Sequence, residues 1–185
     1  MVKETLADAE QRMQRTVEIF QKELAGMRAG RAHPALLDKV QVDYYGTPTP
    51  LAHLAQIAVP EPRLMLVQPY DKSIVNQVEK AIQKADLGVG IQVDGAVVRL
   101  TIPPLTEDRR RELVRQVKRR LEDEKVAVRN IRRDAHEAIK TAEKEKALSE
   151  DESRRVQEQL QKLTDRYIRM LDEIGAAKEK ELMQP

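Results

Sequence analysis

The residues best suited to chemistry in this chain are cations on one predicted helix. Between Lys125 and His136 the apolar residues recur three and four apart, which predicts a helix with one packed face. At about 100° per residue, Arg129, Arg132 and Arg133 fall beside that face together with Lys125 and His136. Clustered guanidinium and ammonium groups of this kind bind phosphates. The stretch therefore suggests a surface for a polyanion.

The clustering continues along the whole helix predicted to contain this stretch. Cations fall within an arc of about 100° of the helical wheel, interrupted only by Glu122, while acidic residues gather on the next arc. We call this set the cationic arc, and its members are Arg111, Arg115, Lys118, Lys125, Arg129, Arg132, Arg133, His136 and Lys140.

The alternative interpretation of the cationic arc is an ordinary solvated face. A purely structural face gains from opposite charges placed four residues apart, whereas like charges at that spacing repel by a few tenths of a kcal/mol each. Same-sign neighbours persist here for several turns. We therefore favour a phosphate-binding surface.

Composition excludes several classes of protein. The net charge is only +2, so the distribution of charge is informative and its sum is not. Aromatic residues are too few for a module that stacks single-stranded bases on aromatic platforms. There is no Cys, and the three His lack metal-ligand spacing, so neither disulfides nor a metal site is expected. Without a signal peptide or membrane span, we expect a cytoplasmic protein.

Three long amphipathic helices must position the cationic arc. The first begins at Leu6 and is expected to stop near Gly30, the second runs from a cap at Thr106 to about Lys146, and the third follows a capping box at Ser149. A four-three alternation, typical of a coiled-coil seam, is predicted in the third helix. The seam comprises Val156, Leu160, Leu163, Tyr167, Met170 and Ile174.

The middle of the chain has a different composition, rich in Pro and Gly. Val40 to Tyr44 alternate as a strand does, residues 46–50 predict a turn, and Asp94-Gly95 predicts a type I′ hairpin. We predict an α+β protein in which residues 1–30 and 105–185 form an antiparallel three-helix bundle. Residues 31–104 form an inserted small α/β domain with a mixed sheet and a helix. Its two connections predict a hinge at Gly30, Arg31, Pro103, Pro104 and Leu105.

Six segments carry a family resemblance that covers essentially the full length of the chain. They are RAGRAHPALLD (28–38), VDYYGTPTPL (42–51), EKAI (79–82), DLG (86–88), IPPLTEDRRREL (102–113) and VAVRNIRRDA (126–135). Together they closely resemble the signature of bacterial ribosome recycling factors. The resemblance implies an L-shaped, two-domain, monomeric translation factor that has no catalytic residue and no cofactor.

The same resemblance implies the partners and the binding residues. Partners would be the 70S ribosome, through large-subunit rRNA near the peptidyl-transferase and tRNA sites, and elongation factor G, which hydrolyses GTP and acts on the inserted domain. The bundle would bind the rRNA, so that subunits, mRNA and tRNA separate after termination. Arg28, Arg31, Arg129, Arg132 and Arg133 match the family's basic residues that face rRNA.

Other functions are less consistent with the residues. The carboxylates of Glu79, Asp86 and Asp94 have nothing to hold two of them in one pocket, and no Gly-rich phosphate loop follows a strand. The remaining alternative is a helical coiled-coil adaptor whose basic face is incidental. Such a protein would self-associate through the seam from Val156 to Ile174 and would not bind ribosomes.

Overall fold

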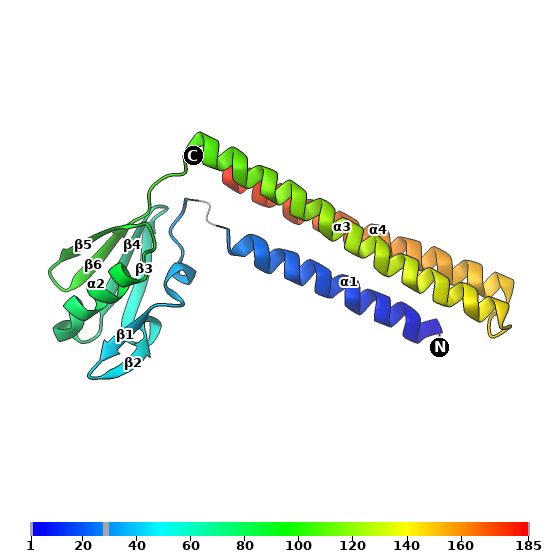
Figure 1. Ribbon diagram of the computed structural model, residues 1–185, viewed down its shortest axis with the longest axis horizontal. Helices are drawn as coiled ribbons and strands as arrows, with labels where there is room; N and C mark the ends of the chain where they lie inside the picture. Colours follow the sequence, from blue (N-terminus) through cyan, green and yellow to red (C-terminus); the bar gives the residue numbers. More distant parts are fainter. Residues whose placement is uncertain (1, 28–29, 185) are drawn as a thin grey trace. The chain divides into compact units, whose positions relative to one another are not determined.

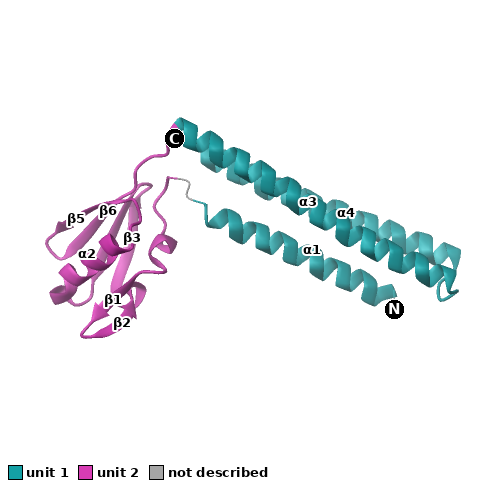
Figure 2. Ribbon diagram, in the orientation of Figure 1, with its two compact units in different colours: residues 1–27, 107–184 teal, residues 28–106, 185 magenta. Residues whose placement is uncertain are grey.

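The computed structural model describes residues 2–27 and 30–184. The chain divides into two compact units, one of residues 1–27 with 107–184 and one of residues 28–106 (Figure 2). The first unit is helical and the second carries the sheets, so the predicted α+β class is confirmed. Within the described part of the chain, no helix has the length and apolarity that crossing a membrane requires.

Three long helices pack together in the first unit (Figure 1). They are α1 (Val2–Ala25), α3 (Glu107–Lys144) and α4 (Glu150–Met183). Ion pairs fix their directions: Arg12 and Glu23 of α1 pair with Asp134 and Arg120 of α3, so these two helices are antiparallel. A short turn joins α3 to α4, which makes that pair antiparallel as well.

Local chemistry ends α3 and starts α4. At the end of α3, Lys146 adopts a positive φ of 60°, and the N–H of Ala147 donates to the carbonyl of Ala142 at 2.9 Å. This is the left-handed C-terminal cap that satisfies terminal carbonyls. At the start of α4, the Ser149 hydroxyl accepts from the N–H of Glu152 at 3.1 Å, which confirms the predicted cap.

The predicted heptad seam of α4 is wrong in detail. Of its six members, Leu163 and Ile174 are only half-buried and Met170 is exposed. The buried residues instead recur at three, four and four, an 11-residue repeat of about 3.7 residues per turn. This wider stripe arises because α4 packs against both α1 and α3. The buried residues are Ser153, Val156, Leu160, Thr164, Tyr167, Leu171, Gly175, Lys178 and Leu182.

The first helix ends earlier than predicted, at Ala25 and not near Gly30. Gly26 follows directly, and glycine is a poor helix former. The ammonium group of the buried Lys178 donates to the carbonyl of Met27 at 3.2 Å. This side chain therefore satisfies a carbonyl that a backbone N–H would satisfy if the helix continued. Gly30 has a positive φ of 71°, but it lies beyond the end of the helix.

The second unit is built on strands β1 to β6 and helix α2 (Val75–Lys84). The strands are β1 (Gln41–Tyr44), β2 (Thr47–Pro50), β3 (Ala55–Glu61), β4 (Leu64–Pro69), β5 (Gly90–Asp94) and β6 (Val97–Thr101). Strands β1 and β2 form a hairpin, and the other four form a sheet in the order β3-β4-β6-β5. Short 3₁₀ helices lie at Pro34–Leu37, Leu51–His53 and Lys72–Ile74.

The predicted mixed sheet is instead antiparallel in every described pair. Strands β4 and β5 do run parallel and are connected through α2, but β6 lies between them and pairs antiparallel with both. On β6, Val98 and Leu100 point inward and Arg99 and Thr101 outward. The inward side chains join those of α2 in the core of this unit.

Both hairpins differ from the sequence prediction at their turns. Residues 47–50, predicted as a turn, form β2, which tolerates its two prolines because it is an edge strand. The turn is Tyr45-Gly46, and both residues have the positive φ of a type I′ turn. The second hairpin is confirmed, but Asp94 is its last paired residue and Gly95-Ala96 is the turn. Only Gly95 has a positive φ there, so that turn is not type I′.

Candidate nucleic-acid interface

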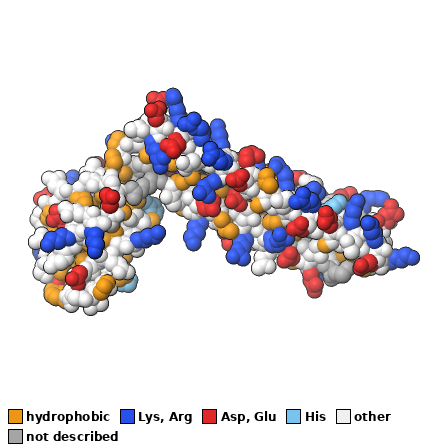
Figure 3. Space-filling view, viewed as in Figure 1, with side chains coloured by type: hydrophobic (Ala, Val, Ile, Leu, Met, Phe, Trp, Pro, Cys, Tyr) orange, Lys and Arg blue, Asp and Glu red, His pale blue; other side chains and the backbone are white. Residues whose placement is uncertain are grey.

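The structure places seven of the predicted binding residues on α3, along one edge of the bundle. In the space-filling view, Lys and Arg side chains gather along the edge formed by α3 (Figure 3). Five of the seven are exposed, whereas Lys125 and Arg132 are half-buried. Of the other two predicted residues, Arg31 belongs to the second unit and is exposed, and Arg28 lies outside the described residues.

Lys125 is distinct from the rest of the cationic arc, because its charge is compensated within the bundle. Its ammonium nitrogen lies 2.6 Å from a carboxylate oxygen of Asp172 on α4 and 3.7 Å from one of Glu122. Only 16% of the Lys125 side chain is exposed. An ammonium held in this way has little charge left for a phosphate, so Lys125 contributes to the α3–α4 interface.

Two other members of the arc have partners on α3 itself. The guanidinium of Arg111 donates to Glu107 at 2.7 Å, and both side chains are largely exposed. Arg133 donates to the amide oxygen of Asn130 at 2.8 Å, a contact that orients its side chain and leaves its charge uncompensated. Arginine has five N–H donors, so each keeps donors for a phosphate.

Among the seven predicted binding residues, the most available cations are Arg115, Lys118, Arg129 and Arg132. None of them forms an ion pair with any residue in the part of the chain that the structure describes. Arg132 is half-buried beside the packed stripe, so part of its side chain is already ordered. Less conformational entropy is then lost when its guanidinium binds an anion.

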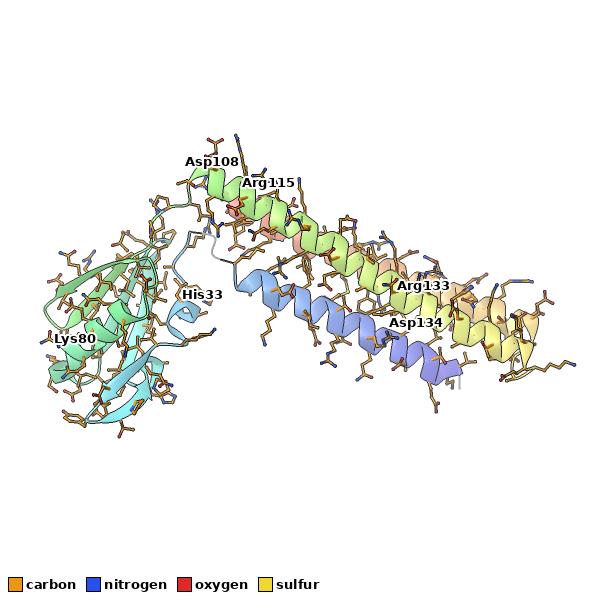
Figure 4. The ribbon with its side chains drawn as sticks, in the orientation of Figure 1. His33, Lys80, Asp108, Arg115, Arg133 and Asp134 are labelled. Carbon is orange, nitrogen blue, oxygen red and sulfur yellow. The ribbon has the colours of Figure 1, made fainter. Side chains whose placement is uncertain are left out.

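The opposite side of α3 has the reverse arrangement, because its charges are paired with α1. Asp134 lies 3.4 Å from Arg12, and Arg120 lies 2.6 Å from Glu23. Figure 4 shows Arg133 and Asp134 as neighbours on α3, in the half of the helix far from its start. Asp134 and Arg120 therefore contribute to the packing of α1 on α3, and the cationic arc retains a surplus of positive charge.

The outer face of α4 shows what an ordinary solvated face looks like in the same bundle. Its exposed cations Arg155 and Lys162 are each followed three residues later by an acid, Glu158 and Asp165. Opposite charges at that spacing attract one another. The segregation seen on α3 is therefore not a general property of this chain.

A polar contact that the sequence analysis did not anticipate lies at the edge of the arc. The Nδ1 atom of His136 lies 2.7 Å from the amide oxygen of Gln157 on α4. The amide nitrogen of Gln157 in turn donates to the His136 carbonyl at 3.3 Å. No spacing rule predicts such a contact between two helices, because it depends on their register.

The predicted hinge residues lie at the edge of the second unit. A Cβ atom on Gly30 would lie 3.1 Å from Leu105, so the two connecting segments touch, and a larger residue is disfavoured at Gly30. The N–H of Ala32 donates to the carbonyl of Pro62 at 2.6 Å, and that of Ile102 donates to the carbonyl of Arg63 at 2.9 Å. Both segments are thus anchored to the turn between β3 and β4. Arg31, Pro103 and Pro104 are exposed.

The acidic side chains of the second unit do not form a metal site with other described residues. No group of three His, Cys, Asp or Glu side chains there is arranged to hold a metal ion. Glu79 accepts a weak hydrogen bond from Gln83, and Asp86 and Asp94 are exposed. Ser73 donates its hydroxyl to the carboxylate of Asp71 at 2.6 Å, and that carboxylate also caps the 3₁₀ helix Lys72–Ile74.

Comparison with known proteins identifies the family of this chain. The family model described as "Ribosome recycling factor" matches residues 20–183. This chain belongs to the ribosome recycling factor family. The ribosome-recycling factors of Symbiobacterium thermophilum and Halalkalibacterium halodurans are each 56% identical to it over 184 residues, with 100% of both chains covered.

Two solved structures of ribosome recycling factors are also similar. One is a solution structure with a TM-score of 0.74 and 43% identity, covering 98% of this chain and 97% of the other. The other, with a TM-score of 0.63 and 42% identity over both full chains, models the Thermus thermophilus factor with Escherichia coli elongation factor G on the E. coli post-termination complex. The family consists of non-enzymatic translation factors for which no cofactor is known.

Proposed function

We propose that the cationic arc binds phosphates of large-subunit rRNA, near the peptidyl-transferase and tRNA sites, and thereby holds this ribosome recycling factor on the post-termination 70S ribosome. With elongation factor G and GTP, the factor separates the subunits, so that mRNA and tRNA leave. The GTP is consumed by elongation factor G, and the work takes place in the cytoplasm, where bacterial ribosomes are.

The observation that carries this proposal is the unequal pairing of charge around α3. On the α1 side, Asp134 and Arg120 are engaged in ion pairs between helices. In the cationic arc, Arg115, Lys118, Arg129 and Arg132 have no such partner among the described residues, although the arc runs for several turns. Unpaired cations in a row attract a phosphate backbone and release its counterions on binding.

We further propose that residues 31–104 form the arm on which elongation factor G acts, and that Gly30, Arg31, Pro103, Pro104 and Leu105 form the hinge. The contact of Gly30 with Leu105 and the anchoring of both segments to one turn support bending at a single place. The chain has no native cysteine, so two engineered cysteines would form one defined disulfide between the units. We expect the locked factor to bind ribosomes but not to split them, and normal splitting would refute the hinge.

The adaptor alternative is weakened by the packing of α4. Self-association needs an exposed apolar seam, yet Val156, Leu160 and Tyr167 are already buried inside this chain's own bundle. Among its other predicted members, Met170 is exposed, but alone it does not make a seam. A monomeric factor is consistent with this arrangement.

Charge reversal at Arg132 tests the binding face. We expect Arg132→Glu to weaken sedimentation with purified large subunits by tenfold or more at low salt, and to reduce subunit splitting with elongation factor G and GTP equally. The matched control is Arg169→Glu on the outer face of α4, which should change binding little. Unchanged binding of the folded Arg132 variant at several ionic strengths would eliminate the arc as the binding face.

A further inference from the structure

We infer that a groove at the start of the cationic arc receives one unstacked base of the bound RNA. The groove has a volume of about 490 Å³, and its lining residues are Asp108, Arg111, Val114, Arg115 and Met183. Asp108 and Arg115 lie at the start of α3 (Figure 4), and Met183 is the last residue of α4. The inference rests on the proposed function, because the base belongs to RNA that the arc already holds.

The apolar lining of the groove comes from Val114 and Met183. Val114 is half-buried, and the Met183 side chain is 54% exposed. A thioether gains little from contact with water, so solvation alone does not explain this exposure. A flexible, polarisable methionine side chain suits a flat aromatic ring, and sulfur–aromatic contacts are favourable. In RNA recognition, bases that have left the stack commonly lie against aromatic rings or against the guanidinium plane of arginine, and this groove offers Arg111 and Arg115.

The polar groups at the rim match the two ends of a nucleotide. Arg115 has no ion-pair partner among the described residues, and the Arg111 guanidinium is held beside the groove by Glu107 at 2.7 Å. Asp108 lies seven residues before Arg115, which places the two about 10.5 Å apart along the helix. A phosphate on Arg115 would leave the Watson–Crick edge of the base directed toward the carboxylate of Asp108.

Guanine is the base that this arrangement favours. Its N1–H and N2–H₂ groups are adjacent donors, and a carboxylate accepts two such hydrogen bonds side by side. Uracil offers one N–H between two carbonyl oxygens, which the carboxylate repels. The same carboxylate disfavours an acidic peptide, so the groove fits a nucleotide better than it fits an acidic segment of a protein partner.

Methionine-methyl NMR on the full-length protein tests the inference with guanosine 5′-monophosphate as the probe. We expect millimolar probe to shift the Met183 methyl resonance in a saturable way, because the ring lies over it. Met170 is the internal control, since it is 37% exposed on α4 and does not line the groove. Uridine 5′-monophosphate should bind more weakly, and inorganic phosphate should leave the Met183 resonance unchanged.

Variants complete the test and separate it from the proposed function. Asp108→Asn should remove the preference for guanine over uracil in the Met183 shift. Met183→Ala lacks the reporter methyl, so its binding is followed through backbone amide shifts, and it should bind the probe about threefold to tenfold more weakly. The groove is refuted if Met183 does not respond, responds equally to phosphate, or shifts no more than Met170. In that case large-subunit binding would still depend on Arg132 if the arc is correct, whereas loss of that dependence would refute the arc itself.

Discussion

Releasing Lys125 from its ion pair should strengthen RNA binding. In the folded chain its ammonium is held 2.6 Å from Asp172, so it does not count among the cations open to phosphate. The substitution Asp172→Asn removes the nearer of its two carboxylates and keeps the size of the side chain; Glu122, at 3.7 Å and exposed, is left as the weaker partner. The long lysine side chain is then able to extend from the interface into the cationic arc.

The structure gives the expected magnitude. Six members of the arc carry charges that no described carboxylate compensates, namely Arg115, Lys118, Arg129, Arg132, Arg133 and Lys140. At about 0.9 per phosphate contact, the slope of log K against log salt concentration should be about 5.4 in magnitude, and about 6.3 when Lys125 joins. Affinity near 0.1 M salt should then rise about threefold to tenfold. Loss of the ion pair should cost about 0.5 to 1 kcal/mol of stability.

The assay is binding to purified large subunits at four or more ionic strengths. Removing any acid raises affinity somewhat through the general field, so a matched control is needed. Asp165→Asn supplies it, because Asp165 lies seven residues earlier on α4, accepts a hydrogen bond from Gln161 at 2.9 Å and forms no ion pair with a described residue. If Asp172→Asn increases affinity and slope no more than Asp165→Asn does, the assignment of Lys125 as a neutralised member of the arc is wrong.

Three further predictions concern stability and the hinge. Burial, together with the nearby carboxylates Glu23 and Asp123, raises the pKa of Glu124 above its ordinary value, so its ionised form costs stability at neutral pH. Glu124→Gln should therefore raise the melting temperature at pH 7. The gain should vanish below about pH 4, where Glu124 is protonated in both the folded and the unfolded state. Gly30→Ala should destabilise the second unit by about 1 kcal/mol or more and impair the splitting of ribosomal subunits. The reason is that Gly30 has a positive φ and the new methyl group would lie 3.1 Å from Leu105. Unchanged unfolding and unchanged subunit splitting would refute this prediction. The Tyr45 hydroxyl donates to Asp71 at 3.2 Å and so connects the first hairpin to the loop before α2. Tyr45→Phe should lower the free energy of unfolding in denaturant by about 0.5 to 1 kcal/mol. Hydrogen exchange should be accelerated in that hairpin and not in the bundle.

The long helices could be predicted from sequence because their signals are local and repeated. Apolar spacing over many turns, together with the Ser149 cap, located α3 and α4 within about two residues. The heptad seam failed because Met170 and Thr164 each fit a helical stripe, and only packing against two neighbours decides which is buried. Periodicity identifies a face but does not measure its width.

The inserted unit was harder to predict because its pairing is set by contacts distant in sequence. No local signal states that β6 lies between β4 and β5, so an antiparallel sheet was predicted as mixed. Pro48 and Pro50 suggested a turn because proline cannot donate to a ladder, but an edge strand exempts them. In the same way, the wheel placed Lys125 in the cationic arc, and only the position of Asp172 on α4 reveals that it is paired.

Repulsion between the unpaired cations of the arc should lower the stability of the bundle. Its measurement distinguishes a role of these cations in binding from a role in the fold. Arg129 lies three and four residues before Arg132 and Arg133, and like charges at these spacings repel by roughly 0.2 to 0.5 kcal/mol per pair. Glutamine has a similar helix propensity, so Arg129→Gln should stabilise the bundle by about 0.4 to 1 kcal/mol at low salt while weakening binding to the large subunit. The gain in unfolding free energy should disappear near 1 M salt, where charges this far apart are screened. Were Arg129→Gln to destabilise the bundle at low salt, Arg129 would contribute to packing or pairing within the fold, and its exposure along the arc would no longer indicate a site kept free for RNA.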